Sequence, residues 1–184
     1  MSRHIRIRRA KMTDIPALQR LIGRSSRELG VACYGPALVE KALESVLGVD
    51  RRLIKDGCYF IAECTGRTAG CGGWSFRNTL YGSDAVAGRD DRMLDPTSEA
   101  ARIRAFFVHP GYTRMGIASR ILERCEAEAR AQGFRSLELG ATLSGVDFYL
   151  ARGFEAMPSV RHELEPGVFM EIVPMRKELP AHQA

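Results

Sequence analysis

The hydrophobic pattern of the chain switches repeatedly between the period of a strand and the period of a helix. Alternating apolar residues predict half-buried strands, and apolar residues three or four positions apart predict amphipathic helices. From Ile5 to Met175 these patterns follow the order β-α-α-β-β-β-α-β-α-β-β. Strands joined by short turns form hairpins, whereas strands separated by helices need crossovers. We therefore predict a mixed α/β fold around one sheet that contains both kinds of connection.

The predicted elements are bounded by glycine, proline and capping residues. The strands are Ile5–Ile7, Cys58–Cys64, Thr68–Phe76, Ile103–Val108, Ser136–Ala141, Val160–Leu164 and Val168–Met175. The helices are Thr13–Leu29, ended by Gly30, then Pro36–Leu47, Ile117–Gln132 and Ser144–Arg152.

The segment from Arg77 to about Glu99 lacks both periods. We expect residues 78–100 to form an insertion loop within a single domain that covers residues 1–184. Residues 83–99 hold five acidic residues and two arginines, a net charge of −3 in a chain of net charge +5. A loop of this length is usually functional or mobile. Its acidic side chains could bind a cationic amine, or they could simply face solvent.

Composition excludes several classes of protein. No apolar run approaches the roughly 18 residues of a membrane span, and the N-terminus lacks the apolar core of a secretory signal. The five cysteines form no Cys-x-x-Cys pair, which argues against disulfides and a zinc site. We expect a cytoplasmic protein without metal or membrane partner. Nucleic-acid binding is not expected, because no aromatic residue lies among Arg3, Arg6, Arg8 and Arg9.

The segment Phe106–Ser119 carries the strongest functional signal. A strand ends at Pro110, a turn follows, and a helix opens at Gly116 and Ala118. A helix N-terminus presents free backbone amides that bind phosphate, and Arg114 adds a positive charge. The segment lacks the Gly-Lys-Ser/Thr ending of a nucleotide P-loop and the three glycines of a dinucleotide-binding motif. From these residues alone, a glycine at an ordinary helix start remains the alternative interpretation.

The segment Val108-His-Pro-Gly-Tyr-Thr-Arg-Met-Gly-Ile-Ala118 resembles the acetyl-CoA signature of the GNAT superfamily of N-acetyltransferases. That signature is Val-x-Pro followed by Gln/Arg-x-x-Gly-x-Gly/Ala, and Thr113 occupies its Gln/Arg position. A second match is Phe148-Tyr-Leu-Ala-Arg-Gly-Phe154, which resembles the family's Phe-Tyr-x-x-x-Gly-Phe. Residues 7–18 are also similar to its first strand and helix. The resemblance covers nearly the whole chain except the insertion.

The resemblance implies a central, mostly antiparallel mixed sheet of about seven strands, flanked by about four helices. In such a fold Ile103–Val108 and Ser136–Ala141 splay apart, and acetyl-CoA fills the gap. The strand would pair with the pantetheine arm, and the helix start would hold the diphosphate. The implied cofactor contacts are Phe106, Phe107, Val108, Arg114, Met115, Gly116, Ile117, Ala118, Ser119 and Ser144.

The implied reaction is transfer of an acetyl group to the primary amine of a small molecule, by direct attack in a ternary complex. Tyr149 is then the candidate general acid, because a phenol of pKa about 10 can protonate a leaving thiolate of pKa about 8.5. Its alternative role is that of a core aromatic. No general base is assigned. The candidates are Glu63, Glu99 and His109.

Several alternatives remain open at this point. The acceptor could be a protein N-terminus or lysine, or the chain could be a non-catalytic acyl-CoA sensor. Trp74 could form the floor of the acceptor pocket or belong to the core. Arg102 and Arg104 could bind a carboxylate or face water. The final strands of the family often mediate dimers, so the resemblance also allows a homodimer.

Overall fold

The computed structural model describes residues 4–180. The outermost residues of the predicted domain, including Arg3, lie outside the described residues. An eight-stranded sheet forms the centre, in the order β1-β2-β3-β4-β5-β8-β6, and β7 pairs with β8 off this path. The strands are β1 (Ile5–Arg9), β2 (Tyr59–Cys64), β3 (Arg67–Ser75), β4 (Ala101–Val108), β5 (Ser136–Thr142), β6 (Glu155–Ala156), β7 (Val160–Glu165) and β8 (Val168–Glu178). Only β4 and β5 pair in parallel, so the sheet is mostly antiparallel, as predicted.

The helices mostly follow the predicted segments. They are α1 (Ile15–Ser25), α2 (Val31–Tyr34), α3 (Pro36–Leu43), α4 (Arg51–Lys55), α5 (Ile117–Ala131) and α6 (Val146–Leu150). Two differences stand out. The first helix does not end at Gly30, because a π-helical turn, Ser26–Gly30, carries it on into α2. Helix α4 is not predicted from the sequence, because five residues are too few to show a helical period. Its N-cap is Asp50, whose side chain accepts hydrogen bonds from the amides of Arg52 and Leu53.

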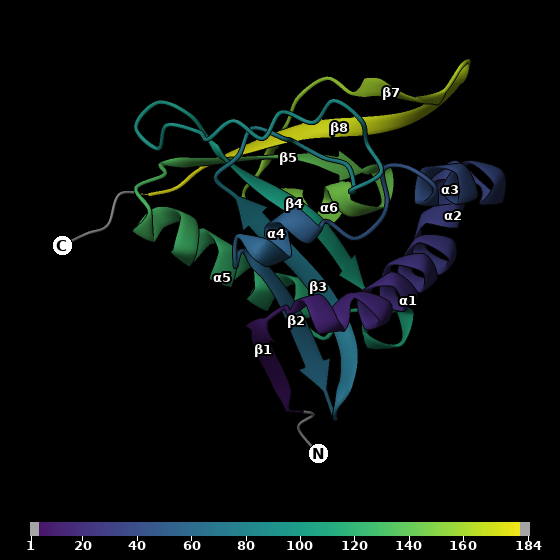
Figure 1. The fold of residues 1–184 in the computed structure, drawn as a ribbon, viewed down its shortest axis with the longest axis horizontal. Coiled ribbons are helices and arrows are strands. Elements are labelled where there is room, and N and C mark those ends of the chain that lie inside the picture. The colour runs from purple at the N-terminus through teal and green to yellow at the C-terminus, as the bar shows by residue number, and fades with distance from the viewer. Residues whose placement is uncertain (1–3, 181–184) are drawn as a thin grey trace.

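A hydrophobic layer covers each face of the sheet. Figure 1 shows helices α5 and α1 on either side of the central strands. Because side chains alternate along a strand, β2 places Phe60 and Ala62 under α5 and Tyr59 and Ile61 under α1 and α4. Trp74 is fully buried in the layer under α5, so it is a core residue rather than the floor of a pocket. All five cysteines are free thiols, as predicted.

A buried ion pair fastens the insertion to the sheet. Arg104 on β4 donates to the Asp50 carboxylate at 2.9 Å, and it also donates to the carbonyls of Thr79 at 2.8 Å and Gly82 at 2.7 Å. Arg89, from the insertion, donates to the same Asp50 oxygen at 2.8 Å. Burial lowers the pKa of Arg104 to about 10, so the guanidinium stays charged at neutral pH. Arg104 is 3% exposed, so the alternative that it faces water is wrong. A contact between Arg104 and a substrate carboxylate stays a prediction.

The remaining charges of this region pair locally. Arg102 forms an ion pair with Glu138 on β5. In the insertion, Glu99 pairs with Arg92 at 2.8 Å, while Asp84 and Asp91 pair with Arg51 and Arg52 of α4 at 3.1 and 3.2 Å.

Among residues 4–180, no helix is long and apolar enough to cross a membrane. Within the same range, no group of three His, Cys, Asp or Glu side chains could hold a metal ion.

Replacing Asp50 by asparagine should strongly destabilise the fold. Two guanidinium groups would lose their shared counter-charge inside the protein, and removing one partner of a buried pair costs about 3–5 kcal/mol. We expect the midpoint of urea unfolding to fall accordingly. The control is Glu28→Gln, which breaks the exposed pair between Arg24 and Glu28 on the helix surface and should barely move the midpoint. Equal effects of the two substitutions would contradict a structural role for Asp50.

Candidate functional site

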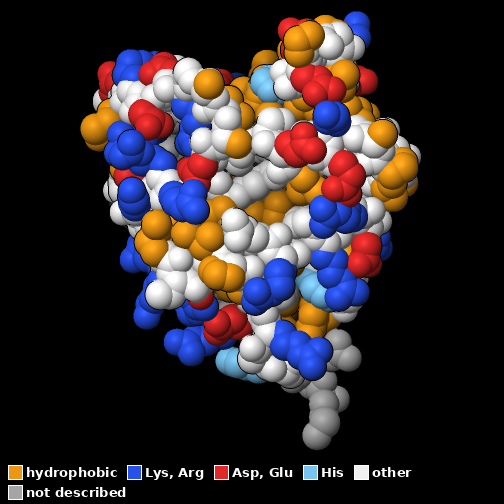
Figure 2. Space-filling model, turned by 45° about the vertical axis from the view of Figure 1, so that its right-hand side comes forward, with side chains coloured by type: hydrophobic (Ala, Val, Ile, Leu, Met, Phe, Trp, Pro, Cys, Tyr) orange, Lys and Arg blue, Asp and Glu red, His pale blue; other side chains and the backbone are white. Residues whose placement is uncertain are grey.

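A cavity of about 930 Å³ opens where β4 and β5 separate. The two strands pair only at Ala101 with Leu137 and at Arg102 with Glu138. Beyond these rungs the edge of β4 that faces β5 is unpaired, which leaves backbone groups of residues 103–108 available to another extended molecule. Figure 2 shows a hollow with hydrophobic side chains in its depth and both basic and acidic side chains around it.

A bulge in β4 shapes the middle of this cavity. The register with β3 shifts so that Ala105 and Phe106 together lie opposite Gly72. Ala105 adopts a φ of 54°, which is rare for a residue with a side chain, and the Tyr59 hydroxyl donates to its carbonyl at 2.9 Å. A Cβ atom at Gly72 would lie only 2.6 Å from the Phe106 ring. A glycine is therefore required where the bulge presses this ring against β3.

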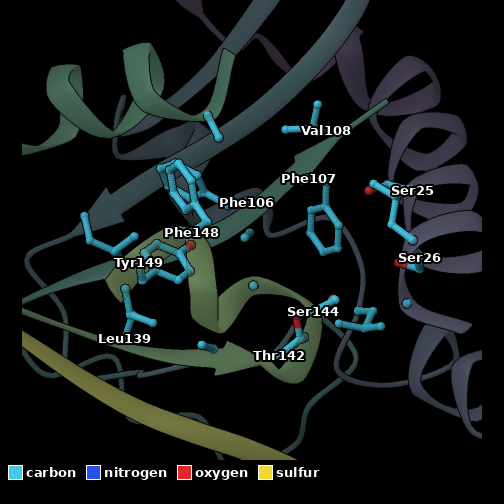
Figure 3. A pocket seen from close by; sticks show the side chains of 18 of the residues that line it. Ser25, Ser26, Phe106, Phe107, Val108, Leu139, Thr142, Ser144, Phe148 and Tyr149 are labelled. Carbon is cyan, nitrogen blue, oxygen red and sulfur yellow. Dashed lines mark hydrogen bonds between the residues drawn. The ribbon is translucent and has the colours of Figure 1, made fainter. Parts of the chain in front are cut away.

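The cavity reaches both faces of the sheet at this point. Phe106 packs with the layer under α5, and Phe107 packs with the layer under α1. Both rings line the cavity, and Figure 3 shows Phe106 beside Tyr149 and Phe107 facing Ser25. We call these two parts the α5 side, with Phe106 and Tyr149, and the α1 side, with Phe107, Ser25 and Ser26.

The start of α5 forms one wall of the α5 side. Gly116 and Arg114 both have positive φ, 74° and 63°, so the loop turns sharply before the helix. The first backbone hydrogen bond of the helix is donated by Arg120. In the described part of the chain, the amides of residues 114–119 donate to no backbone carbonyl. A 15-residue helix adds its dipole to these free amides, so the wall is suited to bind an anionic group.

Tyr149 lies deep in the α5 side, with 8% of its surface exposed. Its ring makes edge contacts with Phe106, Phe148 and Phe154, at centroid distances of 6.2, 5.0 and 5.5 Å. Burial raises the pKa of the phenol above its usual value, so the hydroxyl remains protonated at neutral pH. Among residues 4–180 this hydroxyl has no hydrogen-bond partner, although it lines the cavity. It can therefore donate a proton to a bound molecule.

The structure brings most of the predicted site residues together. The ones that line the cavity are Phe106, Phe107, Val108, Arg114, Gly116, Ile117, Ala118, Ser119, Ser144 and Tyr149. Met115 does not line it, because its side chain packs against the layer under α5. Only the backbone of Met115 could therefore contact a ligand in the cavity.

The candidate bases lie elsewhere. Glu63 accepts from Arg8 at 2.8 Å, and Glu99 is paired with Arg92, which lowers the pKa of Glu99 to about 2. His109 accepts from the amide of Gly111 at 3.0 Å through Nδ1. These three residues are absent from the cavity wall, and so are the acidic residues of the insertion. The acids of the insertion do not line the cavity, and three of them pair with nearby arginines. Binding of a cationic amine by these acids stays a prediction.

Sequence reasoning missed several residues of the α1 side. Ser25 and Ser26 lie where α1 passes into the π-helical turn, and their spacing resembles that of ordinary helix residues. Tyr81 comes from the aperiodic insertion. It packs over Gly140, where a Cβ would lie 2.8 Å from its ring, and its hydroxyl is 3.3 Å from Nδ1 of His162 on β7. No local pattern marks these positions, because all of them depend on contacts between distant segments.

Comparison with known proteins identifies relatives of the whole fold. A model of the Acetyltransferase (GNAT) family matches residues 28–154. The structure of a GCN5-related N-acetyltransferase, described as a class-II aminotransferase, from Rhodopseudomonas palustris is similar with a TM-score of 0.68, 17% identity and 97% coverage of both chains. PaiA N-acetyltransferase from Thermoplasma acidophilum, in complex with coenzyme A, has a TM-score of 0.64 and 15% identity, over 96% of this chain and 99% of that one.

A third similar structure is ribosomal-protein-alanine N-acetyltransferase from Brucella melitensis, with a TM-score of 0.62 and 17% identity, over 95% of this chain and 99% of that one. At these identities the structural likeness establishes the fold alone. No curated protein matches the chain by sequence.

The contact between Tyr81 and His162 should make stability depend on pH. Burial lowers the pKa of His162 below its usual value, so below about pH 6.5 the unfolded chain binds more protons at this site than the folded chain. The stabilising effect is present above that pH and is lost as the pH falls through the lowered pKa. We expect the free energy of unfolding to drop more between pH 7.5 and 5.5 in the native protein than in His162→Gln. An identical drop in both would refute the effect.

Proposed function

The chain belongs to the acetyltransferase (GNAT) family, and we propose that it transfers an acetyl group from acetyl-CoA to the primary amine of a small molecule. One observation carries the proposal. The free amides at the start of α5 and the unpaired edge of β4 border the same cavity. A molecule with a phosphate group at one end and an extended amide-containing arm fits both features.

The residues of the α5 side offer the types of group that the parts of acetyl-CoA require. The amides of residues 114–119 and the Arg114 side chain would hold the diphosphate, which is the most anionic part of the molecule's core. Backbone groups of Phe106, Phe107 and Val108 would pair with the pantetheine arm as an added strand. Ser144, across the cavity, offers a further hydroxyl. Thr113 stands where relatives carry Gln or Arg, and the neighbouring Arg114 supplies the cation.

The acetyl donor supplies a thioester, and the protein has to manage the charge that develops during transfer. The amine nitrogen forms a bond to the acetyl carbon while the carbon–sulfur bond breaks. A backbone amide of Phe106 or Phe107 would donate to the carbonyl oxygen as it becomes negative. Tyr149 would give its proton to the departing sulfur, and the surplus proton on nitrogen would return through water to the Tyr149 oxygen, which restores the acid. Burial raises the pKa of the phenol, so Tyr149 carries its proton when the transfer begins.

Replacing Tyr149 by phenylalanine tests the acid. The ring and its contacts remain, so acetyl-CoA should bind with unchanged affinity, while kcat should fall roughly 100-fold, the usual contribution of a general acid. The readout is release of free thiol at saturating acetyl-CoA and amine, beside a direct binding measurement. Undiminished turnover would remove Tyr149 from the mechanism. Binding of acetyl-CoA without turnover of any amine by the native protein would favour the sensor over the enzyme.

Replacing Gly116 by alanine tests the diphosphate site. The positive φ of Gly116 is strained for alanine by about 1–2 kcal/mol, so the loop that presents the amides should shift. We expect acetyl-CoA affinity, measured by calorimetry, to fall about tenfold. The matched control is Gly167→Ala in the β7–β8 turn, where φ is 78° and a Cβ likewise meets no atom within 4 Å. Equal loss of affinity in both variants would contradict the assignment.

A further inference from the structure

We propose that the acceptor is a monoamine with an apolar body and one uncharged hydrogen-bonding group, and that Ser25 and Ser26 recognise this group. The inference rests on the proposed function, because it assigns the α1 side of the cavity to the acceptor. It excludes polycationic acceptors such as polyamines and aminoglycosides. Three observations on that side of the cavity support it.

The first observation is the apolar character of the α1 side. Beyond Phe107 its wall is made by side chains from the π-helical turn, α3, the segment after α3 and the insertion. The apolar ones are Leu29, Val39, Val46, Leu47 and Leu80. Such a wall gains free energy by burying a hydrocarbon or aromatic body. It also disfavours an ammonium ion, since transfer into apolar surroundings lowers the pKa of an amine. The amine is therefore bound in the neutral form that can attack, which agrees with the missing base.

The second observation is the sign of the charges around the cavity. Its wall holds three arginines, Arg104, Arg114 and Arg152, and a single carboxylate, Asp147. Asp147 is an exposed residue of α6, close in sequence to Tyr149 and Ser144, and does not belong to the α1 side. Behind the α1 side, Arg104 and Arg89 share the one carboxylate of Asp50. A second ammonium group of the acceptor would meet no counter-charge there, which makes its burial costly.

The third observation is a buried hydroxyl group without a partner, next to a second serine. Ser25 and Ser26 are each 5% exposed, and within residues 4–180 the Ser26 hydroxyl has no hydrogen-bond partner. Both line the cavity, and in Figure 3 they lie on the helix that faces Phe107. Buried hydroxyls are normally paired, and π-helical turns are frequent at functional sites. A hydroxyl or carbonyl on the acceptor would satisfy one or both serines after a rotation about a single bond.

The test compares three amines for binding to the protein saturated with coenzyme A, by calorimetry. Tyramine has an aromatic body and one hydroxyl, phenethylamine lacks only the hydroxyl, and spermidine is a polycation. We expect tyramine to bind at least tenfold more tightly than spermidine. Spermidine binding as tightly as tyramine, or no detectable binding of either aromatic amine, would overturn the inference.

Variants of the serines test the recognition itself. Ser25→Ala and Ser26→Ala each remove one hydroxyl, and loss of a hydrogen bond should weaken tyramine binding roughly three- to tenfold in at least one of them. Phenethylamine binding should not change. Ser98→Ala, in the exposed part of the insertion, is the matched control and should leave both affinities intact. Equal losses for both amines, or no loss in either variant, would refute recognition by the serines.

Turnover separates this inference from the proposed function. Tyramine that binds but releases no thiol from acetyl-CoA would overturn the transferase activity and leave the class of ligand standing. Thiol release with spermidine in preference to tyramine would support the transferase and overturn the class of acceptor. If tyramine is turned over, kcat/KM should rise with pH in proportion to its neutral fraction, since among residues 4–180 no carboxylate or imidazole lines the α1 side.

Discussion

The ion pair between Arg104 and Asp50 holds together β4, the start of α4 and the insertion, and both β4 and the insertion line the cavity. Arg104 belongs to β4, Asp50 caps α4, and the carbonyls that Arg104 also contacts belong to the insertion. A charged pair with almost no exposed surface is unfavourable unless every donor finds an acceptor. The insertion is therefore held in place by the buried donors of Arg104, which need its carbonyl groups as acceptors, and not by weak surface contacts. Thr79 and Gly82 flank Tyr81 in the chain, so their hydrogen bonds to Arg104 also fix the position of Tyr81 in the cavity wall.

Strand β4 meets two demands at once, and the bulge at Ala105 reconciles them. One edge of the strand pairs with β3, while the other is freed from β5 after two rungs. The bulge adds a residue between Arg104, whose side chain must reach Asp50, and Phe107, which faces α1. The Tyr59 hydroxyl holds the bulged carbonyl, so the strain of a positive φ is compensated inside the core. The α5 side and the α1 side of the cavity meet at this irregular point.

Charge counted along the sequence does not report which charged side chains border the cavity. The acidic insertion in a basic chain suggested a cationic acceptor, but in the structure its carboxylates pair with nearby arginines or cap local turns. A carboxylate that already has a partner exerts little attraction at a distance in salt. The charges that matter at the cavity are few. Which charged side chains lie there depends on the strands and helix ends that border the cavity, and the net charge of the chain contains no information on that arrangement.

The sequence by itself determined the order of the elements, the mixed sheet and the strand–turn–helix from Phe106 to Ser119. These features depend on local signals, namely hydrophobic period, proline and glycine, which act over a few residues. Only the tertiary structure decided the bulge, the burial of Arg104 and the meeting of Ser25 with Phe107. Each of these depends on the distance between segments far apart in the chain, and a single sequence carries no period that encodes such a distance. The α5 side of the cavity was therefore visible in the sequence, whereas the α1 side emerged only when the chain was folded.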